Sequence, residues 1–279
     1  MEDEEIKLLK NVPIKRKMIK IKNFVQPSPS TDFAWWLGAL AGDGHVAFDR
    51  VTLKVIDKDF ANNFMKIGED IFKIKSKLKE YLRQDPLIKR KLQYIIIFYS
   101  QRLSQYLGDW SWLNWNKTME NKFSWILGDQ DYTSSFLSGY FDAEGSVVCK
   151  YHKTQHRFLA KYAAQPEHIK ICLSNMLDNI KIKHSVYSGG IQICGLQNLK
   201  RFAVLIKSSI NRKQERLNAI KNIKVRYEEE YKIAQDLRIQ NLKINQISKL
   251  LDVPLSTIEG WFYKKHKPHQ IIRGQLLNE

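Results

Sequence analysis

The chain has 279 residues, of which 43% are hydrophobic, enough for one large domain or two ordinary ones. Its formal net charge of +17 favours a polyanionic partner, nucleic acid first, over a role in which charge serves only solubility. Cys149, Cys172 and Cys194 are too far apart for a zinc knuckle or a redox pair. No apolar run is long enough to cross a membrane and no secretion signal opens the chain, so we expect a reducing intracellular compartment, cytoplasm or organelle matrix.

The first part of the chain predicts a tail and then a mixed unit of helices and strands. Residues 1–30 form a basic tail whose cations could follow a phosphate backbone or stay solvated. A helix is expected from Thr31 or Asp32, either of which could cap it, through the apolar residues 33–41. The alternation in "VAFDRVTLKVID" predicts a strand pair with one apolar and one partly basic face. An amphipathic helix in "FANNFMKIGEDIFKI", a strand in "LQYIIIFYS" and a helix in "LSQYLGDWSWLNW" follow.

From about Asp131 the same order begins again. An apolar helix over 132–143 precedes strand segments in 149–165, a helix over 166–180, a hairpin around "GG" and a helix over 196–209. The chain therefore carries an internal repeat, which sets its architecture. Residues 228–267 lack strand patterns and predict three short helices, typical of a helix-turn-helix. We expect a tail over 1–30, repeats over 31–130 and 131–226, and a helical domain over 227–279.

Small residues mark one face of the apolar helix in each repeat. Gly38 and Gly42 are four residues apart, as are Gly139 and Ala143. Glycine inside a helix costs about 1 kcal/mol relative to alanine, so a close backbone approach is the expected reason. The two helices should therefore pack on each other along these faces. The glycines that follow them, Gly44 and Gly145, are expected in the left-handed conformation that ends a helix.

An acid ends each of these helices, Asp43 in the first repeat and Glu144 in the second. The helix dipole disfavours a negative charge at this end, and parallel packing would also bring two carboxylates together. A compensating cation is expected, and oxygen ligands of this kind suit Mg²⁺. The simpler alternative is that each acid is an ordinary exposed residue before a turn. The repetition of the whole arrangement favours the cation site.

Both segments resemble a known signature. "LSGYFDAEG", Leu137 to Gly145, resembles that of the LAGLIDADG homing endonucleases, and "WLGALAGDG", Trp36 to Gly44, resembles its first copy, with Ala41 where that family often has an acid. The resemblance covers residues 31–226. It implies an α+β fold, a monomer with duplicated αββαββα halves whose signature helices form the interface. Each half would lay an antiparallel sheet into the major groove of double-stranded DNA.

The same resemblance implies site residues and chemistry. Asp43 and Glu144, with main-chain oxygens of Gly42 and Ala143, would hold Mg²⁺ or Mn²⁺ and support phosphodiester hydrolysis on both strands. Polar residues before the helix that follows the first two strands of each half would complete the sites. These are Asp57, where glutamine or lysine is commoner in the family, and Gln165. Lys122 and Lys213 are the candidate basic residues.

Residues on the polar strand faces and on the third C-terminal helix are candidates for DNA contact, to bases or to phosphates. In the first sheet they are Arg50, Thr52 and Lys54, and in the second Arg157, Lys161, Lys183, Ser185, Tyr187 and Gln192. In the helix-turn-helix they are Ser256, Thr257, Glu259, Tyr263 and Lys264, above a core that includes Ile247, Leu250, Val253, Ile258 and Trp261.

Two alternatives to a homing endonuclease remain open. Some proteins of this superfamily assist RNA splicing as maturases, so intron RNA is a possible partner. One bacterial regulator family joins a decayed copy of the fold to a helix-turn-helix. A regulator has no need to keep Asp43 and Glu144 beside their glycines, which favours the nuclease.

Overall fold

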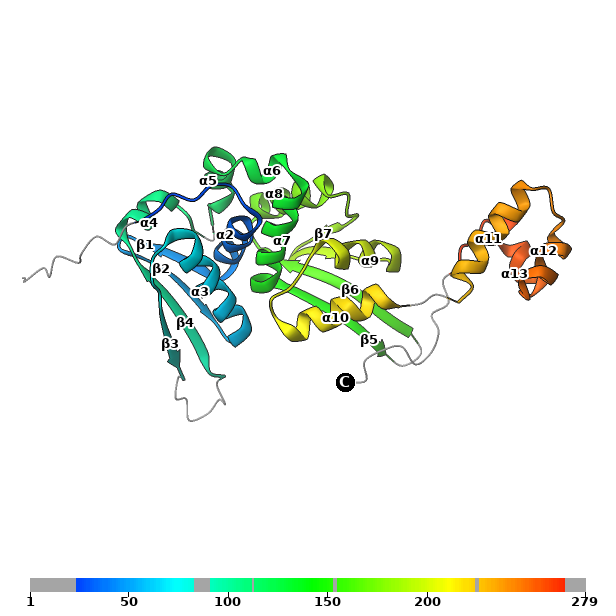
Figure 1. Ribbon diagram of the computed structural model, residues 1–279, viewed down its shortest axis with the longest axis horizontal. Helices are drawn as coiled ribbons and strands as arrows, with labels where there is room; N and C mark the ends of the chain where they lie inside the picture. Colours follow the sequence, from blue (N-terminus) through cyan, green and yellow to red (C-terminus); the bar gives the residue numbers. More distant parts are fainter. Residues whose placement is uncertain (1–23, 83–90, 112, 153–154, 224–225, 269–279) are drawn as a thin grey trace, which may run out of the picture.

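The computed structural model describes residues 24–82, 91–111, 113–152, 155–223 and 226–268, without the side chains of 149–157. Most of the expected basic tail lies outside these ranges. The rest of the chain forms a body of two similar lobes and a small helical module (Figure 1). Within the described ranges, no helix is both long and apolar enough to cross a bilayer.

The two lobes repeat one order of elements, αββαββα, which confirms the predicted α+β duplication. The first lobe is built from α2 (Thr31–Asp43), β1 (Gly44–Ala47), β2 (Arg50–Val55), α3 (Lys58–Phe72), β3 (Lys77–Tyr81), β4 (Gln93–Tyr99) and α4 (Gln101–Leu107). The second is built from α7 (Gln130–Glu144), β5 (Gly145–His152), β6 (Gln155–Ala163), α8 (Glu167–Asn179), β7 (Ser185–Tyr187), β8 (Gly190–Ile193) and α9 (Leu196–Leu205). Further helices follow each lobe: α5 (Trp115–Lys122), α6 (Trp125–Gly128) and α10 (Asn211–Asn222).

Each lobe carries a four-stranded antiparallel sheet, and the two sheets have the same strand order. The orders are β1-β2-β4-β3 and β5-β6-β8-β7. One face of each sheet packs on helices, because alternate residues such as Val51, Leu53 and Val55 are buried while their neighbours are polar. β3 was not identified in the sequence, since all five of its residues are exposed and no apolar alternation marks it.

Helices α2 and α7 cross the centre of the body side by side, as the small-residue faces predicted (Figure 1). A Cβ on Gly38 would overlap the carbonyl oxygen of Phe136 and lie 3.0 Å from the amide nitrogen of Tyr140. A Cβ on Gly139 would overlap the carbonyl of Trp35. Contacts advance in the same direction along both helices, so the pair is parallel and its two C-terminal ends meet.

Helix boundaries correct several sequence predictions. Ser30, not Thr31 or Asp32, caps α2, with its hydroxyl accepting from the amide of Phe33 at 3.1 Å. The helix expected over 103–115 ends at Leu107, since Gly108 at φ 66° closes it. The helix expected over 196–209 ends at Leu205.

The prediction of left-handed glycines after the two acids was wrong. Gly44 and Gly145 are extended, with φ of −88° and −86°, and each begins a strand directly after its helix. Glycine is needed there for space. A Cβ on Gly44 would overlap Leu40 of its own helix, and one on Gly145 would overlap Phe141. Both acids are therefore held rigidly at a junction between helix and strand.

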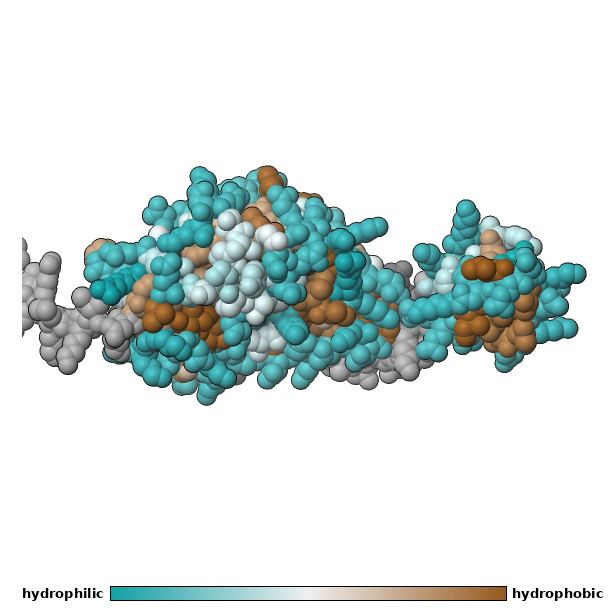
Figure 2. All heavy atoms as spheres, turned by 45° about the horizontal axis from the view of Figure 1, so that its top comes forward, coloured by the Kyte–Doolittle hydropathy of each residue, from teal (hydrophilic) through white to brown (hydrophobic). Residues whose placement is uncertain are grey.

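A continuous hydrophobic core joins the two lobes. Aliphatic residues surround many aromatic side chains in it, and Trp36 stacks on Phe64 with ring centroids 4.7 Å apart. Hydrophilic residues cover most of the surface seen in Figure 2, and apolar residues gather in patches. One such patch lies on the C-terminal module.

That module consists of α11 (Glu228–Ile239), α12 (Ile244–Leu251) and α13 (Leu255–Phe262), as the sequence predicted. It has its own small core, in which Trp261 packs edge-on against Tyr231. Leu250, expected in this core, is 64% exposed because it lies on the outer side of α12. Among the described contacts, the module reaches the body through Glu228, which accepts from Gln197 at 3.0 Å and pairs with Lys200 at 3.6 Å.

The close approach of α2 and α7 gives a direct prediction. Gly38→Ala should lower the free energy of unfolding by about 2 to 3 kcal/mol, because the added methyl must push two backbones apart. Gly128→Ala is the matched control, since a Cβ there meets no atom within 4 Å. Urea unfolding followed by circular dichroism compares the two variants. Equal stability of Gly38→Ala and the unmodified chain would contradict the packing.

Candidate active site

The two signature acids lie next to each other at the C-terminal ends of α2 and α7. Asp43 is the last residue of α2 and Glu144 the last of α7. A Cβ on Gly42 would overlap the methyl of Ala143 and lie 3.1 Å from Cγ of Glu144, so the two helix ends are in contact. The packing of α2 on α7 through their small residues therefore brings the two carboxylates close together.

Their surroundings make both carboxylates harder to ionise. Burial and, to a smaller extent, the charge of Glu144 raise the pKa of Asp43 to about 6 against the opposing charge of Lys213. Burial also raises the pKa of Glu144, again opposed by Lys213. Asp43 nevertheless reaches solvent, and Glu144 is half-buried. Two adjacent, destabilised carboxylates with open access are a natural position for a divalent cation.

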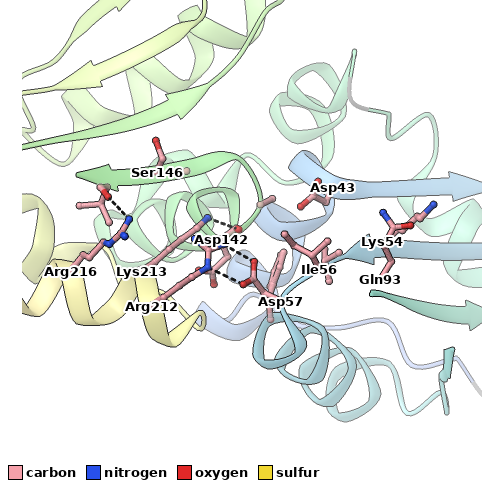
Figure 3. A pocket seen from close by; sticks show the side chains of 15 residues that line it. Asp43, Lys54, Ile56, Asp57, Gln93, Asp142, Ser146, Arg212, Lys213 and Arg216 are labelled. Carbon is pink, nitrogen blue, oxygen red and sulfur yellow. Dashed lines mark hydrogen bonds and ion pairs between the residues drawn. The ribbon is translucent and has the colours of Figure 1, made fainter. Parts of the chain in front are cut away.

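A cavity of about 320 Å³ opens beside Asp43, between the two lobes (Figure 3). Its walls come from β2, the start of α3 and β4 in the first lobe, and from the α7–β5 junction and α10 in the second. Its charged and polar lining residues are Asp43, Lys54, Asp57, Gln93, Asp142, Ser146, Arg212, Lys213 and Arg216. The basic side chains in this lining could contact an anionic substrate, and the carboxylates could contact a metal ion.

Lys213 projects from α10 into the end of α7 (Figure 3). Its ammonium donates to the carbonyl oxygens of Phe141 and Asp142, both at 2.8 Å. The carbonyl of Phe141 also accepts from the amide of Gly145, so Lys213 adds a second donor there, and its charge is favoured by the negative C-terminal end of the helix dipole. Burial lowers the pKa of Lys213 to about 8, and the charge of Asp142 opposes this shift. The lysine predicted from sequence thus lines the cavity together with Asp43, whereas Glu144 is not among the lining residues.

An ion pair ties α10 to the first lobe. Arg212 Nε donates to Oδ1 of Asp57 at 3.0 Å and Nη2 to Oδ2 at 2.8 Å. The backbone amide of Asn211 donates to Oδ2 of Asp59 at 2.7 Å. Asp57 precedes α3 but makes no side-chain cap, because its carboxylate is bound by Arg212. This predicted site residue therefore lines the cavity but is already engaged.

A further carboxylate, Asp142, is fully buried and was missed in the sequence. Its oxygens accept from Trp35 Nε1 at 3.2 Å, from the amide of Ser209 at 3.0 Å, from the hydroxyl of Ser209 at 2.8 Å and from the hydroxyl of Ser208. These bonds fix the loop before α10 to both signature helices. The available signal was its position, since it is the one acid within the apolar part of the predicted helix. Ala41 is its counterpart in the first copy.

The structure does not bring the remaining predicted residues to this cavity. Lys122, in α5, donates to the carbonyl of Tyr106 and lies 4.2 Å from the centroid of that ring. Gln165 is exposed between β6 and α8. Neither lines the cavity beside Asp43.

The donors present fit a hard divalent cation. Two neighbouring carboxylates with raised pKa values are oxygen ligands that such a cation would stabilise. Within the described residues, no group of three or more His, Cys, Asp or Glu side chains is placed to hold a metal. A metal here would thus complete its coordination with main-chain, water or substrate oxygens.

Most of the predicted polar residues lie on the open face of each sheet, which Ile95 and Ile97 of β4 share in the first lobe. On β2, Arg50 and Lys54 are exposed and Thr52 is half-buried. In the second lobe Ser185 and Tyr187 are exposed, and Lys161 and Gln192 are half-buried. Lys183 precedes β7 and is not part of the sheet, while the side chain of Arg157 lies outside the described part.

Aromatic and basic residues on β3 and β4 join these faces and were not predicted. Lys54 lies over the ring of Tyr81 at 5.3 Å, and Lys77 over Tyr99 at 5.4 Å. Lys161 and Tyr187 make the same contact in the second lobe, at 5.3 Å. Lys77 and Tyr81 were omitted because they lie on the missed strand β3, whereas Tyr99 lies on a strand that was predicted. Such pairs hold cations in defined places on both faces.

On α13 the predicted contact residues lie at the surface. Ser256, Glu259, Tyr263 and Lys264 are exposed and Thr257 is half-buried. Ile258 and Trp261 face the core of the module. The helix therefore presents a continuous polar side, although its binding to DNA stays a prediction.

Comparisons with known proteins agree with this architecture. Residues 131–207 match a family model described as a LAGLIDADG-like domain. The homing endonuclease I-WcaI, bound to its DNA recognition sequence, aligns at 15% identity over 75% of this chain and 96% of that chain, with a TM-score of 0.50. I-DmoI in complex with DNA and Mn aligns at 16% identity over 63% and 96%, with a TM-score of 0.42.

A further similar structure is full-length DUF199/WhiA from Thermatoga maritima, at 12% identity over 86% of this chain and 92% of that chain, with a TM-score of 0.47. No curated protein matches the sequence. The family model and the I-WcaI alignment confirm the resemblance: the chain has the LAGLIDADG homing endonuclease fold.

The raised pKa of Asp43 predicts a stability difference that depends on pH. Because its folded pKa of about 6 exceeds the ordinary 3.8, ionised Asp43 destabilises the fold near neutrality, and the penalty vanishes once both states are protonated. Without metal, Asp43→Asn should raise the free energy of unfolding at pH 7.5 by up to about 1 kcal/mol, allowing for solvent screening, and hardly at all at pH 3.5.

Urea unfolding in EDTA at the two pH values measures this difference. Asp236→Asn, a change to a surface acid of the separate module, is the control and should show no such pH dependence. If Asp43→Asn raised the free energy of unfolding by the same amount at both pH values, the ionised carboxylate of Asp43 would not destabilise the fold.

Proposed function

We propose that the protein is a site-specific DNA endonuclease that hydrolyses phosphodiester bonds in both strands of a long duplex target. The observation that carries this proposal is the pairing of Asp43 and Glu144 at the joined ends of α2 and α7, beside the buried Lys213. The excess of positive charge and the two polar sheet faces support DNA as the substrate. Since one chain supplies both acids, the active form is a monomer.

Asp43 and Glu144, with main-chain oxygens of Gly42 and Ala143, would hold Mg²⁺ or Mn²⁺. When bound, the cation would supply Lewis-acid stabilisation of the negative charge on the phosphate oxygens. Lys213, fixed by two carbonyls, places a positive charge near the same phosphate and orders water there. Gln165 is the polar residue proposed for the second strand. Lys122 remains the candidate basic residue of the first repeat, and its amine would have to leave the carbonyl of Tyr106 to reach a phosphate.

Asp57 and Arg212 act as positioning residues in this proposal. Their ion pair is 2.8 Å long and the Asp57 side chain is only 20% exposed, so the pair is a firm attachment for the first turn of α10. Lys213 follows Arg212 directly. Asp142 fixes the preceding loop from the other side through Ser208 and Ser209. The ammonium of Lys213 is thereby held between two lobes before substrate arrives.

A regulator that binds DNA without cutting it is the second candidate, since the chain also carries the helical module. The presence of Asp43 and Glu144 argues against such a regulator. They are destabilised in the free protein, and binding alone gives no reason to retain them. A maturase role with intron RNA is compatible with cleavage and has no support of its own in the structure.

Cleavage should require a divalent metal and both acids. Asp43→Asn and Glu144→Gln keep the packing of the helix ends but remove the charge that holds the cation, so binding should persist. Double-strand cleavage should fall at least about 100-fold, the scale typical for lost charge stabilisation. Gel assays on duplexes selected for binding measure both activities, with Asp236→Asn as the control. Undiminished cleavage by the double variant would refute the nuclease proposal.

The C-terminal module is proposed to extend the DNA contact without taking part in hydrolysis. Its polar α13 surface is followed by three exposed lysines, Lys264, Lys265 and Lys267. A module attached at one end of the body should protect extra base pairs on one side of the target only.

Removing residues 227–279 should shorten the footprint on that side and flatten the salt dependence of binding, because phosphate contacts are lost. Cleavage should return at higher protein concentration. Lys264→Gln in the full chain should reduce the salt slope by about one. A footprint and slope unchanged by the truncation would show that the module does not touch DNA.

A further inference from the structure

The open face of the first sheet has an apolar centre. On β4 the side chains alternate, so that Ile96 and Phe98 enter the core while Ile95 and Ile97 lie on the opposite face. Ile97 is only 7% exposed, yet it lies outside the main core cluster of the described residues. Ile95 is half-buried. The two isoleucines therefore form a short apolar strip on a surface that is otherwise polar.

Cations and a hydroxyl flank this strip on both sides. The strand register places Lys54 of β2 and Lys79 of β3 beside Ile95. It places Thr52 and Lys77 beside Ile97. Lys54 of β2 reaches across β4 to the ring of Tyr81 on β3, and Lys77 of β3 leans onto Tyr99 of β4. Their amines therefore lie beside the two ends of the strip, and the face combines a narrow apolar centre with cations around it.

This combination selects among possible ligands. An apolar protein partner would not match the cationic border, and a phosphate backbone alone would leave the isoleucines without a partner. The DNA major groove offers both features, with phosphates at its edges and one apolar group on its floor, the C5-methyl of thymine. Guanine, adenine and cytosine carry no methyl group at the floor of that groove.

We propose that Ile95, supported by Ile97, reads the methyl groups of thymine in the half of the target bound by the first sheet. The inference rests on the DNA-binding part of the proposed function and adds a base preference to it. It does not depend on hydrolysis. Lys54, Lys77 and Lys79 contribute affinity from the borders, while the isoleucines contribute the choice of base.

Removal of single methyl groups from DNA tests this proposal. Duplexes are first selected from a randomised library by the full chain in EDTA, which prevents cutting. Each thymine of the selected site is then replaced by deoxyuridine, which lacks only the C5-methyl. At one or two neighbouring positions binding should weaken about fourfold, the effect of about 0.8 kcal/mol for one buried methyl.

Ile95→Ala identifies the residue responsible. At those positions the variant should bind thymine and deoxyuridine equally, because the methyl has lost its partner. Ile95→Val should keep most of the preference, which guards against a general disturbance of the sheet. Ile171→Ala is the matched control, since Ile171 is 54% exposed on α8 and away from the sheet face. It should keep the full preference.

The outcomes separate this inference from the proposed function. Tight binding to selected DNA with no sensitivity to deoxyuridine, or a preference that survives Ile95→Ala, overturns the thymine reading alone. A thymine preference in a protein that never cuts DNA supports the reading and refutes the nuclease. Absence of binding to any duplex overturns both.

Discussion

The direct contact between the backbones of α2 and α7 is the constraint on which the rest of the structure depends. At Gly38 and Gly139 the facing carbonyls occupy the volume where a side chain would begin, so any larger residue must separate the helices. Close contact fixes the angle and register of the pair, and the parallel direction brings both C-terminal ends together. Asp43 and Glu144 consequently meet at a place that electrostatics alone would disfavour. Packing energy along the helices holds the two charges in an arrangement that protonation or a bound cation relieves.

The two lobes share a fold but differ at this junction. Asp142 anchors the loop before α10 through Ser208 and Ser209, whereas Ala41 occupies the same place in the first signature. The start of α10 is attached to the opposite lobe through Asp57 and Asp59. As a result Lys213 is delivered to a cavity built from both lobes. The cavity is a property of the whole body, and a single repeat would not contain it.

The sequence predicted the duplication, the paired helices and the acids, because glycine spacing and period-two alternation are local signals. The exposed strand β3 carried no such signal and was missed, together with its lysines and Tyr81. Asp57 was predicted as a site residue, but its engagement by Arg212, 155 residues away, depends on tertiary structure. Gly44 and Gly145 were correctly singled out and wrongly explained: they are extended, and crowding by Leu40 and Phe141 requires them. Local sequence motifs therefore identify the reactive side chains, but the residues that contact each of them depend on the tertiary structure.

The central claim is that the joined ends of α2 and α7 form a divalent cation site. The most direct measurement is the anomalous scattering of Mn²⁺ in crystals of the full chain bound to a selected duplex. The account predicts anomalous peaks beside the carboxylates of Asp43 and Glu144, and their loss at the altered position in Asp43→Asn. Well-ordered DNA across both sheets with no Mn²⁺ peak near either acid would contradict it.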